Sequence, residues 1–274
     1  MQDLKDKVAV VTGAGSGIGE GIARAAVAAG MNVVVADIDV ANAERVAAEL
    51  GERAVAVPVD VSSLASVEAL RDATLAQYGA VHLLCNNAGV WVGALMQEAD
   101  IEDWKFLIDV NLYGVINGVR AFLPLLLEQG EGHIVNTASM GGLISGPPEG
   151  LYTTTKFAVM GLSEALLLEV ANQGVGVSVL CPGLVNTNLI TQSGALRAEM
   201  VKTGKNHDQP APDVASGISP GLVGEQVIDA VREGGFYIIT HDDYREILKM
   251  RHDGIIDALD ANAARYGSTS GSAQ

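Results

Sequence analysis

The chain has 274 residues, of which 49% are hydrophobic and 18% charged, and this length suits one large α/β domain. Its formal net charge of −16 disfavours binding to nucleic acid and to anionic membranes, so small molecules and protein subunits are the expected partners. The opening residues MQDLKDKVAV lack the apolar run of a signal peptide, and charges or glycines interrupt the other apolar runs before they reach membrane-spanning length. We therefore expect a cytoplasmic protein with no membrane partner.

Valine-rich runs bounded by turn residues alternate with alanine-rich segments of helical period, which is typical of βαβ units. The predicted strands are residues 8–11, 32–36, 54–57, 82–85, 133–136, 177–180 and 236–239. The predicted helices are residues 18–29, 40–50, 64–78, 102–127, 151–172 and 222–232. Right-handed crossovers then give an α/β fold, a doubly wound parallel sheet of seven strands in a single domain of residues 1–266. The tail, 267–274, has the composition of a disordered end.

The segment TGAGSGIG follows the first strand and opens the first helix, which is the context of a phosphate-binding turn. Glycines at 13, 17 and 19 allow a pyrophosphate to approach the backbone, with Ser16 and Ile18 between them. The second strand ends in Asp37, followed by Ile38, and the Asp37 carboxylate can accept hydrogen bonds from a ribose hydroxyl pair. The sequence therefore predicts a dinucleotide site of Rossmann type.

Small polar residues follow the next two strands and are expected at the same edge of the sheet. They are Asp60 and Val61 in PVDVS, and Asn87, Ala88 and Gly89 in CNNAG. Each Asp or Asn alone is equally well explained as a turn former.

Three further residues form a candidate catalytic group. Ser139 ends the strand HIVNTAS, and Tyr152 and Lys156 in YTTTK stand four residues apart, on one face of a helix. An ammonium near the phenol is expected to lower the pKa of Tyr152, which then exchanges a proton with an alcohol or ketone while hydride moves to or from a nicotinamide. Ser139 is expected to hold the substrate oxygen.

Residues 5–240 resemble the short-chain dehydrogenase/reductase family, through TGAGSGIG, Asp60-Val61, NNAG, DVNLYG, Ser139, YTTTK and CPGLVNT in the family's order. The resemblance implies that Asn111 completes a Ser-Tyr-Lys-Asn tetrad by holding a water in a proton relay. It also implies that Pro182, Gly183, Val185 and Thr187 form a cofactor loop. Val185 would hold the nicotinamide carboxamide by its backbone and Thr187 by its hydroxyl, while Tyr152 and Lys156 also contact the cofactor.

The expected cofactor is NAD, because Asp37 would repel a 2′-phosphate and neither Ser16 nor Ile38 supplies a cation. The expected function is an NAD-dependent interconversion of a secondary alcohol and its ketone. Two alternatives stay open: an NADPH-dependent carbonyl reductase, and a catalytically silent nucleotide-binding protein of the same family.

Residues 188–221 are too long for a plain connection and are predicted to form a substrate lid, with KTGKNHDQPAPD as a mobile outer turn, although a simple surface excursion also fits. Lid and neighbouring residues would give an apolar wall that suits a bulky aliphatic or aromatic substrate. The predicted substrate-binding residues are Trp91, Met140, Leu143, Leu184, Leu189 and Met200.

The sequence also allows predictions for its cysteines and histidines, for two apolar helices and for the C-terminal extension. Cys85 and Cys181 are predicted to be buried, unreactive thiols, and the five histidines show no metal-binding spacing. The helices at 102–127 and 151–172 carry more apolar residues than one sheet face needs, which predicts a homodimer or homotetramer. A charged helical extension replaces the glycine-rich ending of many tetrameric family members. Together with NLYGVINGVRAFLPLL it resembles members that oxidise aryl-propanoid or other bulky alcohols.

Overall fold

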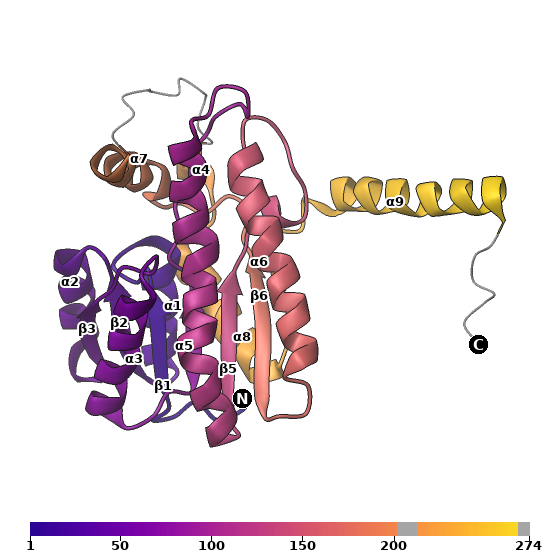
Figure 1. Ribbon diagram of the computed structural model, residues 1–274. Helices are drawn as coiled ribbons and strands as arrows, with labels where there is room; N and C mark the ends of the chain where they lie inside the picture. The colour runs from indigo at the N-terminus through magenta and orange to yellow at the C-terminus, as the bar shows by residue number, and fades with distance from the viewer. Residues whose placement is uncertain (202–212, 268–274) are drawn as a thin grey trace. The chain divides into compact units, whose positions relative to one another are not determined.

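The computed structural model describes residues 1–201 and 213–267, which contain a seven-stranded, all-parallel sheet (Figure 1). The strand order is β3-β2-β1-β4-β5-β6-β7, which confirms the predicted doubly wound arrangement. The strands are β1 Val8–Thr12, β2 Asn32–Asp37, β3 Ala54–Pro58, β4 Leu83–Asn86, β5 Gly132–Thr137, β6 Val175–Cys181 and β7 Tyr237–Ile239. Each lies within a few residues of its predicted position.

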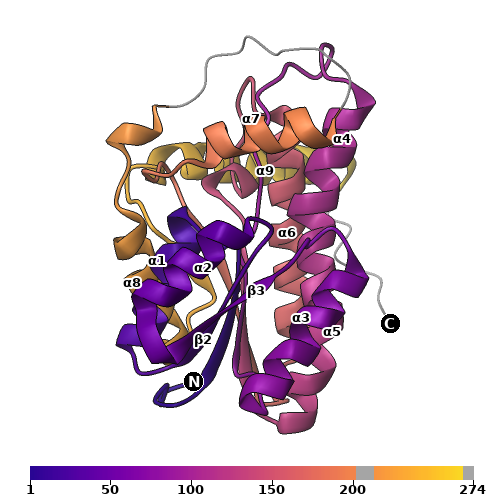
Figure 2. The ribbon, with the colours of Figure 1, turned by 90° about the vertical axis from the view of Figure 1, so that its left-hand side faces the viewer.

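Helices cover both faces of the sheet (Figure 2). On one side lie α1 (Gly17–Ala28), α2 (Val40–Leu50) and α8 (Pro220–Glu233), and on the other lie α3 (Leu64–Tyr78), α5 (Gly114–Gln129) and α6 (Gly150–Glu169). The strands alternate between two cores: Val10 and Val34 belong to one cluster, and Val11 and Val33 to the other. This is why the strands read as continuous valine runs instead of alternating apolar and polar residues.

The predicted helix at 102–127 is interrupted. It divides into α4 (Ile101–Leu107), a π-helical segment η2 (Ile108–Tyr113) and α5, beginning with a capping box between Asp100 and Asp103 and ending before Gly130. By length and composition the run Ile101–Gln129 could cross a membrane, contrary to the expectation that no segment is long enough. Half of its apolar window is buried inside the protein, as in the core helix of a globular domain.

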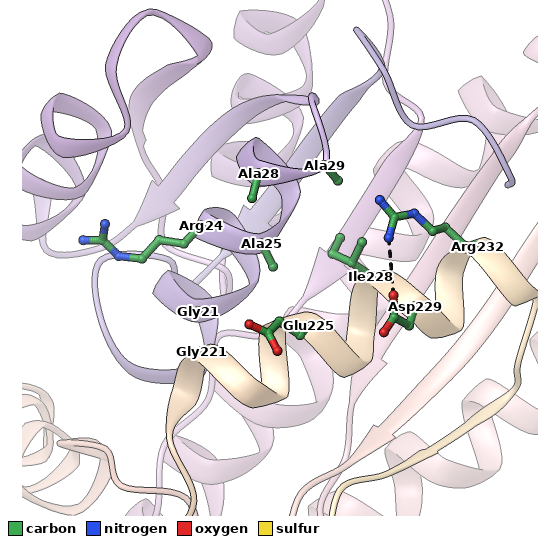
Figure 3. A pocket seen from close by; sticks show the side chains of 10 residues that line it. All are labelled: Gly21, Arg24, Ala25, Ala28, Ala29, Gly221, Glu225, Ile228, Asp229 and Arg232. Atoms are coloured by element: carbon green, nitrogen blue, oxygen red, sulfur yellow. Dashed lines mark hydrogen bonds and ion pairs between the residues drawn. The ribbon is translucent and has the colours of Figure 1, made fainter.

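Helices α1 and α8 approach each other closely at a pair of glycines. A Cβ atom on Gly21 would lie 2.1 Å from the carbonyl oxygen of Pro220, and one on Gly224 would lie 2.2 Å from that of Gly21. Beside this contact the two helices form an open surface pocket, shown in Figure 3, whose lining includes Arg24 and Glu225. None of the predicted catalytic or cofactor-binding residues lines it.

The predicted lid contains helix α7 (Leu189–Met200) and a short 3₁₀ turn, η4 (Val214–Ser216). Most of the predicted outer turn, residues 202–212, and most of the predicted disordered tail, 268–274, lie outside the described residues.

Contacts divide the chain into two units, Met1–Thr240 and His241–Gln274, so the main unit ends earlier than the expected single domain of 1–266. The second unit contains α9 (Arg245–Tyr266), which confirms the predicted helical extension and has no buried residue.

One buried histidine makes the stability of the sheet depend on pH. His133 of β5 lies within hydrogen-bond distance of Ser178 in β6, 2.7 Å between Nε2 and Oγ. Burial, aided by the N-terminal ammonium, lowers the pKa of His133 from 6.5 to about 4. Above pH 6.5 the ring is neutral in both states, whereas between 6.5 and 4 only the unfolded chain takes the proton. The contribution of His133 to the free energy of unfolding is therefore fully present above pH 6.5, the pKa in the unfolded chain. It is lost as the pH falls towards about 4, the pKa in the folded protein.

We expect this group alone to remove about 2 kcal/mol of unfolding free energy between about pH 6.5 and pH 5. Urea unfolding across this range should show a smaller loss in a His133→Gln variant than in the parent. A His252→Gln variant, changed at an exposed position of α9, should follow the parent, and equal slopes in all three proteins would contradict the prediction.

Candidate active site

The glycine-rich turn connects β1 to α1 at the carboxyl edge of the sheet. Gly13 and Gly17 have φ angles of +65° and +54°, and a Cβ on Gly19 would lie 2.1 Å from the Gly13 carbonyl oxygen. Ser16 is the N-cap of α1 but its side chain makes no capping hydrogen bond. The turn therefore needs glycine and presents the amino terminus of α1, a site that favours an anion. Ile18, in the first turn of α1, packs on the core beneath it.

Asp37 lies at the end of β2, beside this turn. Its Oδ2 accepts a hydrogen bond from Gly15 N at 2.8 Å, and its Oδ1 accepts one from Asp39 N at 2.9 Å. Burial raises the pKa of Asp37, while these backbone donors oppose the rise. The next residue, Ile38, is 49% exposed and supplies no charge.

A positively charged residue that the sequence did not point to, Arg45, contacts the same glycine-rich turn. Arg45 of α2 donates from Nη2 to the Gly15 carbonyl oxygen at 3.0 Å. It also pairs with Glu20 at 2.9 Å and Glu49 at 3.1 Å. Arg45 stands thirty residues along the chain from Gly15, so no local spacing pointed to this contact.

The polar residues after β3 and β4 are held by the protein itself. Asn87 N and Ala88 N both donate to Thr12 Oγ1, at 3.0 and 3.1 Å, and Asn87 Nδ2 donates to the Thr12 carbonyl. Asp60 Oδ1 accepts from the Ser62 hydroxyl at 2.6 Å. These contacts support a structural role for Asn87 and Asp60 in forming turns. Both residues also lie at the sheet edge where the nucleotide is predicted to bind.

The Val61 carbonyl accepts a hydrogen bond from Asn117 Nδ2 at 2.9 Å. Gly89 lies beside the proposed catalytic group, because a Cβ there would be 3.2 Å from Asn111 Oδ1 and 3.6 Å from Lys156 Nζ.

Ser139 and Tyr152 lie together at the end of β5 and the start of α6. Gly141 N donates to Ser139 Oγ at 3.0 Å, and Ser139 interacts with the Tyr152 phenol. Burial raises the pKa of Tyr152 to about 12, with the Ser139 hydrogen bond opposing the rise and the charge of Glu149 adding to it. The expectation of a lowered pKa is wrong here, because dehydration of the phenolate outweighs the neighbouring donors.

Lys156 is buried, one helical turn after Tyr152. Its Nζ lies 5.6 Å from the centre of the Tyr152 ring and donates to the Thr137 carbonyl oxygen at 2.9 Å. Burial lowers the pKa of Lys156 to about 8. The carbonyl at the end of β5 thus holds the ammonium near the Tyr152 ring, and the side chain retains two further donors.

Asn111 lies in the π-helical segment η2 and is fully buried. Its Oδ1 accepts from Val90 N at 2.8 Å, and its Nδ2 donates to the Val90 carbonyl at 2.9 Å and to Thr155 Oγ1 at 3.2 Å. The side chain therefore ties the segment after β4 to α6. A π-helical turn is a feature often found at functional sites, and Asn111 lies within this one.

The segment after β6 comes close to the glycine-rich turn. A Cβ on Gly17 would lie 3.1 Å from Thr187 Cγ2. Val185 forms an isolated parallel bridge with Ile218 that uses the Leu184 carbonyl and the Asn186 amide. This pairing leaves the backbone groups of Val185 directed away from Ile218, as the predicted carboxamide contact requires.

The start of this segment is anchored on both sides. The Pro182 carbonyl accepts from Met140 N at 2.8 Å, and Gly183 N donates to Thr240 Oγ1 at 3.3 Å. Met140 is buried beside Ser139.

The other predicted substrate residues differ in exposure. Trp91, Leu143, Leu184 and Leu189 are partly buried, whereas Met200, the last residue of α7, is 47% exposed. Because Met200 is so exposed, it is the least well supported of the predicted substrate-binding residues.

Ser193 is the one buried residue of α7, Leu196 is partly buried against the core, and polar contacts hold the helix as well. The Ser16 hydroxyl donates to Gln192 Oε1 at 3.0 Å, Trp91 N donates to Ser193 Oγ at 2.9 Å, and Arg197 Nε donates to Asp103 Oδ1 at 2.6 Å. These contacts connect α7 with the glycine-rich turn, the segment after β4 and α4. Such a helix can close over a site and release again without exposing a large apolar surface.

The predicted lid role of α7 can be tested by replacing Arg197 with Met, which removes its ion pair with Asp103. Asp103 has a fully buried side chain, and removing a buried partner typically costs about 3 kcal/mol or more. We expect KM for the substrate to rise about ten-fold or more, with faster hydrogen exchange in α7 and little change in cofactor affinity. The matched control is Arg232→Met, which breaks the exposed pair with Asp229 and should leave KM unchanged. An unchanged KM in both variants would contradict a lid role for α7.

The two cysteines are free and buried, as predicted. Burial raises the pKa of the Cys85 thiol and that of Cys181, the latter to about 12. Strand β5 lies between their strands, β4 and β6. Within residues 1–201 and 213–267, no group of three or more His, Cys, Asp or Glu residues is arranged to hold a metal ion.

The sheet order and the glycine-rich turn define a Rossmann-type nucleotide-binding fold. The family model for short chain dehydrogenases matches residues 7–197, and the chain belongs to this family of oxidoreductases.

Relatives support the same assignment. The chain is 36% identical over 258 residues to 1-deoxy-11-beta-hydroxypentalenate dehydrogenase of Streptomyces exfoliatus, covering 92% of this chain and 89% of the relative. A Burkholderia phymatum short-chain dehydrogenase/reductase solved in complex with NAD has a TM-score of 0.86 and 38% identity, covering 93% of this chain and 96% of that one. A Brucella melitensis 3-ketoacyl-(acyl-carrier-protein) reductase complexed with NADH has a TM-score of 0.75 and 32% identity, with coverages of 86% and 96%.

Proposed function

We propose that the protein is an NAD-dependent oxidoreductase that interconverts a secondary alcohol carrying a bulky apolar or aromatic group and its ketone. The observation that carries the proposal is the grouping of Ser139, Tyr152 and buried Lys156 at the carboxyl edge of the sheet, next to the glycine-rich turn.

The proton chemistry follows from these contacts. Ser139 Oγ accepts from Gly141 N, and its hydroxyl makes only a long contact of 3.5 Å with the Pro182 carbonyl, so a substrate oxygen can compete for the hydroxyl hydrogen. Tyr152, with its raised pKa, is protonated at neutral pH and is suited to donate to a ketone oxygen. For alcohol oxidation the same residue must accept a proton, and the Lys156 ammonium stabilises the phenolate that this requires. The nicotinamide, when bound, supplies or takes the hydride.

NAD is favoured over NADP by Asp37. The glycine-rich turn and the amino terminus of α1 fit a pyrophosphate, and the segment around Val185 and Thr187 reaches the same edge of the sheet. The Asp37 carboxylate at the end of β2 fits a ribose with free hydroxyls and repels a phosphate there. The Burkholderia and Brucella relatives, solved with NAD and NADH, support the NAD(H) side of this choice.

The substrate class rests on the buried and partly buried apolar residues near the catalytic group. Trp91, Met140 and Leu143 belong to segments that adjoin Asn111 and Ser139, and α7 is tethered to the first of these segments through Ser193. Such a wall favours apolar surface over small charged groups, by about 25 cal/mol per Å² covered.

The decisive experiment measures NADH formation or consumption with bulky aromatic and aliphatic secondary alcohols, their ketones and small charged hydroxy acids. We expect turnover of the bulky compounds, with kcat/KM at least about ten-fold above that of the hydroxy acids. A preference for the hydroxy acids would contradict the substrate class, and no turnover of any member would favour a silent nucleotide-binding protein.

A second candidate is an NADPH-dependent carbonyl reductase. The observation that favours it is Arg45, whose guanidinium contacts the Gly15 carbonyl and brings a positive charge to the turn beside Asp37. Because Arg45 is already paired with Glu20 and Glu49, we place this candidate second.

We further propose that the protein is a homo-oligomer that associates through α5 and α6. Most apolar residues of these helices pack into the core, so fewer are left exposed than the sequence indicated. Leu168 of α6 is nevertheless 76% exposed, and Tyr113, directly before α5, is 50% exposed. Light scattering at micromolar concentration should give a dimer or tetramer mass, reduced by Leu168→Glu. A monomer mass for the parent protein would contradict the proposal.

A further inference from the structure

The serine at the start of α1 directs its hydroxyl away from its own helix. Ser16 is the N-cap of α1, and a serine in that position ordinarily accepts a hydrogen bond from an amide of the first helical turn. Here the side chain makes no such bond and donates to Gln192 Oε1 at 3.0 Å, across 176 residues of chain. The amides of the first turn are therefore left for a ligand, and the Gln192 side chain lies next to the residue that begins the helix.

The Gln192 side chain has more hydrogen-bonding capacity than this contact uses. A carboxamide carries an acceptor oxygen and an NH₂ group with two hydrogens to donate. The oxygen accepts from Ser16, whereas Nε2 donates to no group within residues 1–201 and 213–267. Because the side chain is exposed, a ligand can reach this nitrogen. Unused donors thus stand at the glycine-rich turn.

The start of the predicted lid contacts the same turn at a second point. A Cβ on Gly17 would lie 3.1 Å from Thr187 Cγ2. Thr187 stands two residues before α7, and Gln192 N donates to the Asn188 carbonyl at 2.9 Å in the first turn of this helix. The regular helical backbone therefore places Gln192 on the part of α7 that meets the nucleotide-binding turn.

The charges around the turn make an additional uncharged donor useful. The pyrophosphate of a dinucleotide is negative, and so is the whole chain, with a net charge of −16. Arg24 and Arg45 lie on α1 and α2, on either side of a pair of acids. Each of them pairs with both Glu20 and Glu49, which offset their positive charge. An anion at this turn therefore depends on neutral donors, which are the backbone amides and the Gln192 side chain.

We propose that Gln192 is a cofactor-binding residue, whose side-chain NH₂ group donates to the pyrophosphate held at the glycine-rich turn. The inference rests on the proposed function, because it requires a bound dinucleotide, and it adds a contact that comes from the predicted lid. A ligand shifts a protein towards the conformation in which it makes the additional contact. Cofactor binding therefore stabilises the closed position of α7 before the substrate arrives.

The test measures the dissociation constants of NAD and of ADP-ribose, which has the same pyrophosphate but no nicotinamide, by calorimetric titration. Gln192→Ala should weaken both ligands by about ten-fold, as expected for the loss of a hydrogen bond to a charged group. A loss for NAD alone would place the effect at the nicotinamide and would overturn the proposal. So would binding of both ligands within about two-fold of the parent protein.

Two charged variants separate this role from a purely structural connection between α7 and the turn. Gln192→Glu keeps an oxygen that accepts from Ser16 but repels the pyrophosphate, so it should weaken both ligands more than Gln192→Ala does. Gln192→Lys loses the acceptor but supplies a cationic donor, so it should bind both at least as tightly as the parent. The opposite order, with tight binding in Gln192→Glu and weak binding in Gln192→Lys, would show a structural connection only and would overturn the proposal.

The matched control is Gln77→Glu, an equal change of charge at an exposed position near the end of α3, which should keep the parent values. Hydrogen exchange provides a second readout. ADP-ribose should slow exchange in α7 of the parent protein and slow it less in Gln192→Ala, whereas equal slowing in both would contradict the proposed contact.

Failure of the proposed function gives a different result, since these titrations need no turnover. If the protein oxidises none of the alcohols but the variants bind in the expected order, the proposed reaction fails and the role of Gln192 stands. If the parent protein prefers NADP, the same order is expected with NADP, which carries the same pyrophosphate. A parent protein that binds neither dinucleotide nor ADP-ribose would overturn both proposals.

Discussion

Replacing Tyr152 by Phe is expected to lower kcat by about a thousand-fold or more while leaving the affinity for NAD nearly unchanged. The substitution removes one buried hydroxyl, the group that exchanges the proton with substrate, and keeps the ring beside Lys156. Steady-state kinetics with a bulky alcohol, together with cofactor titration, measures both effects.

Lys156→Ala serves as the comparison, because its loss should reduce kcat and weaken cofactor binding together. Tyr266→Phe is the matched control, an exposed tyrosine at the end of α9 that makes no proposed proton transfer. If Tyr152→Phe retained a tenth of the parent rate, Tyr152 would not be the proton donor.

The second large effect concerns cofactor choice. The parent enzyme should use NAD with kcat/KM about a hundred-fold above NADP, equivalent to about 2.8 kcal/mol. The Asp37 carboxylate would stand against the 2′-phosphate, and its two backbone hydrogen bonds fix it in that position. Kinetics with both cofactors under identical conditions gives the ratio directly.

Asp37→Ser should bring the two cofactors to within about ten-fold of each other, since it removes the like charge while Arg45 remains at the turn. Adding Arg45→Met to this variant should then weaken NADP more than NAD. Equal or better use of NADP by the parent enzyme would instead support the NADPH-dependent reductase.

Much of the fold could be predicted from the sequence because the signals are local. A strand buried on both faces must be apolar at successive positions, and Val33, Val34 and Val35 show this directly. The turn after β1 requires glycine for the backbone reason found at Gly13 and Gly19. Tyr152 and Lys156 share a face of α6 because four residues make about one helical turn. The sequence alone therefore determined the sheet, the nucleotide turn and the composition of the candidate catalytic group.

Only the tertiary structure shows the contacts between side chains that belong to different helices, strands and loops. Arg45 meets Gly15, Arg197 meets Asp103 and Gln192 meets Ser16, and none of these pairs has a spacing that the sequence could reveal. The raised pKa of Tyr152 likewise follows from burial by residues of several elements. Helical and strand periodicities act over a few neighbouring residues, whereas the charges, hydrogen bonds and hydration at a site are set by side chains that meet only after the chain has packed.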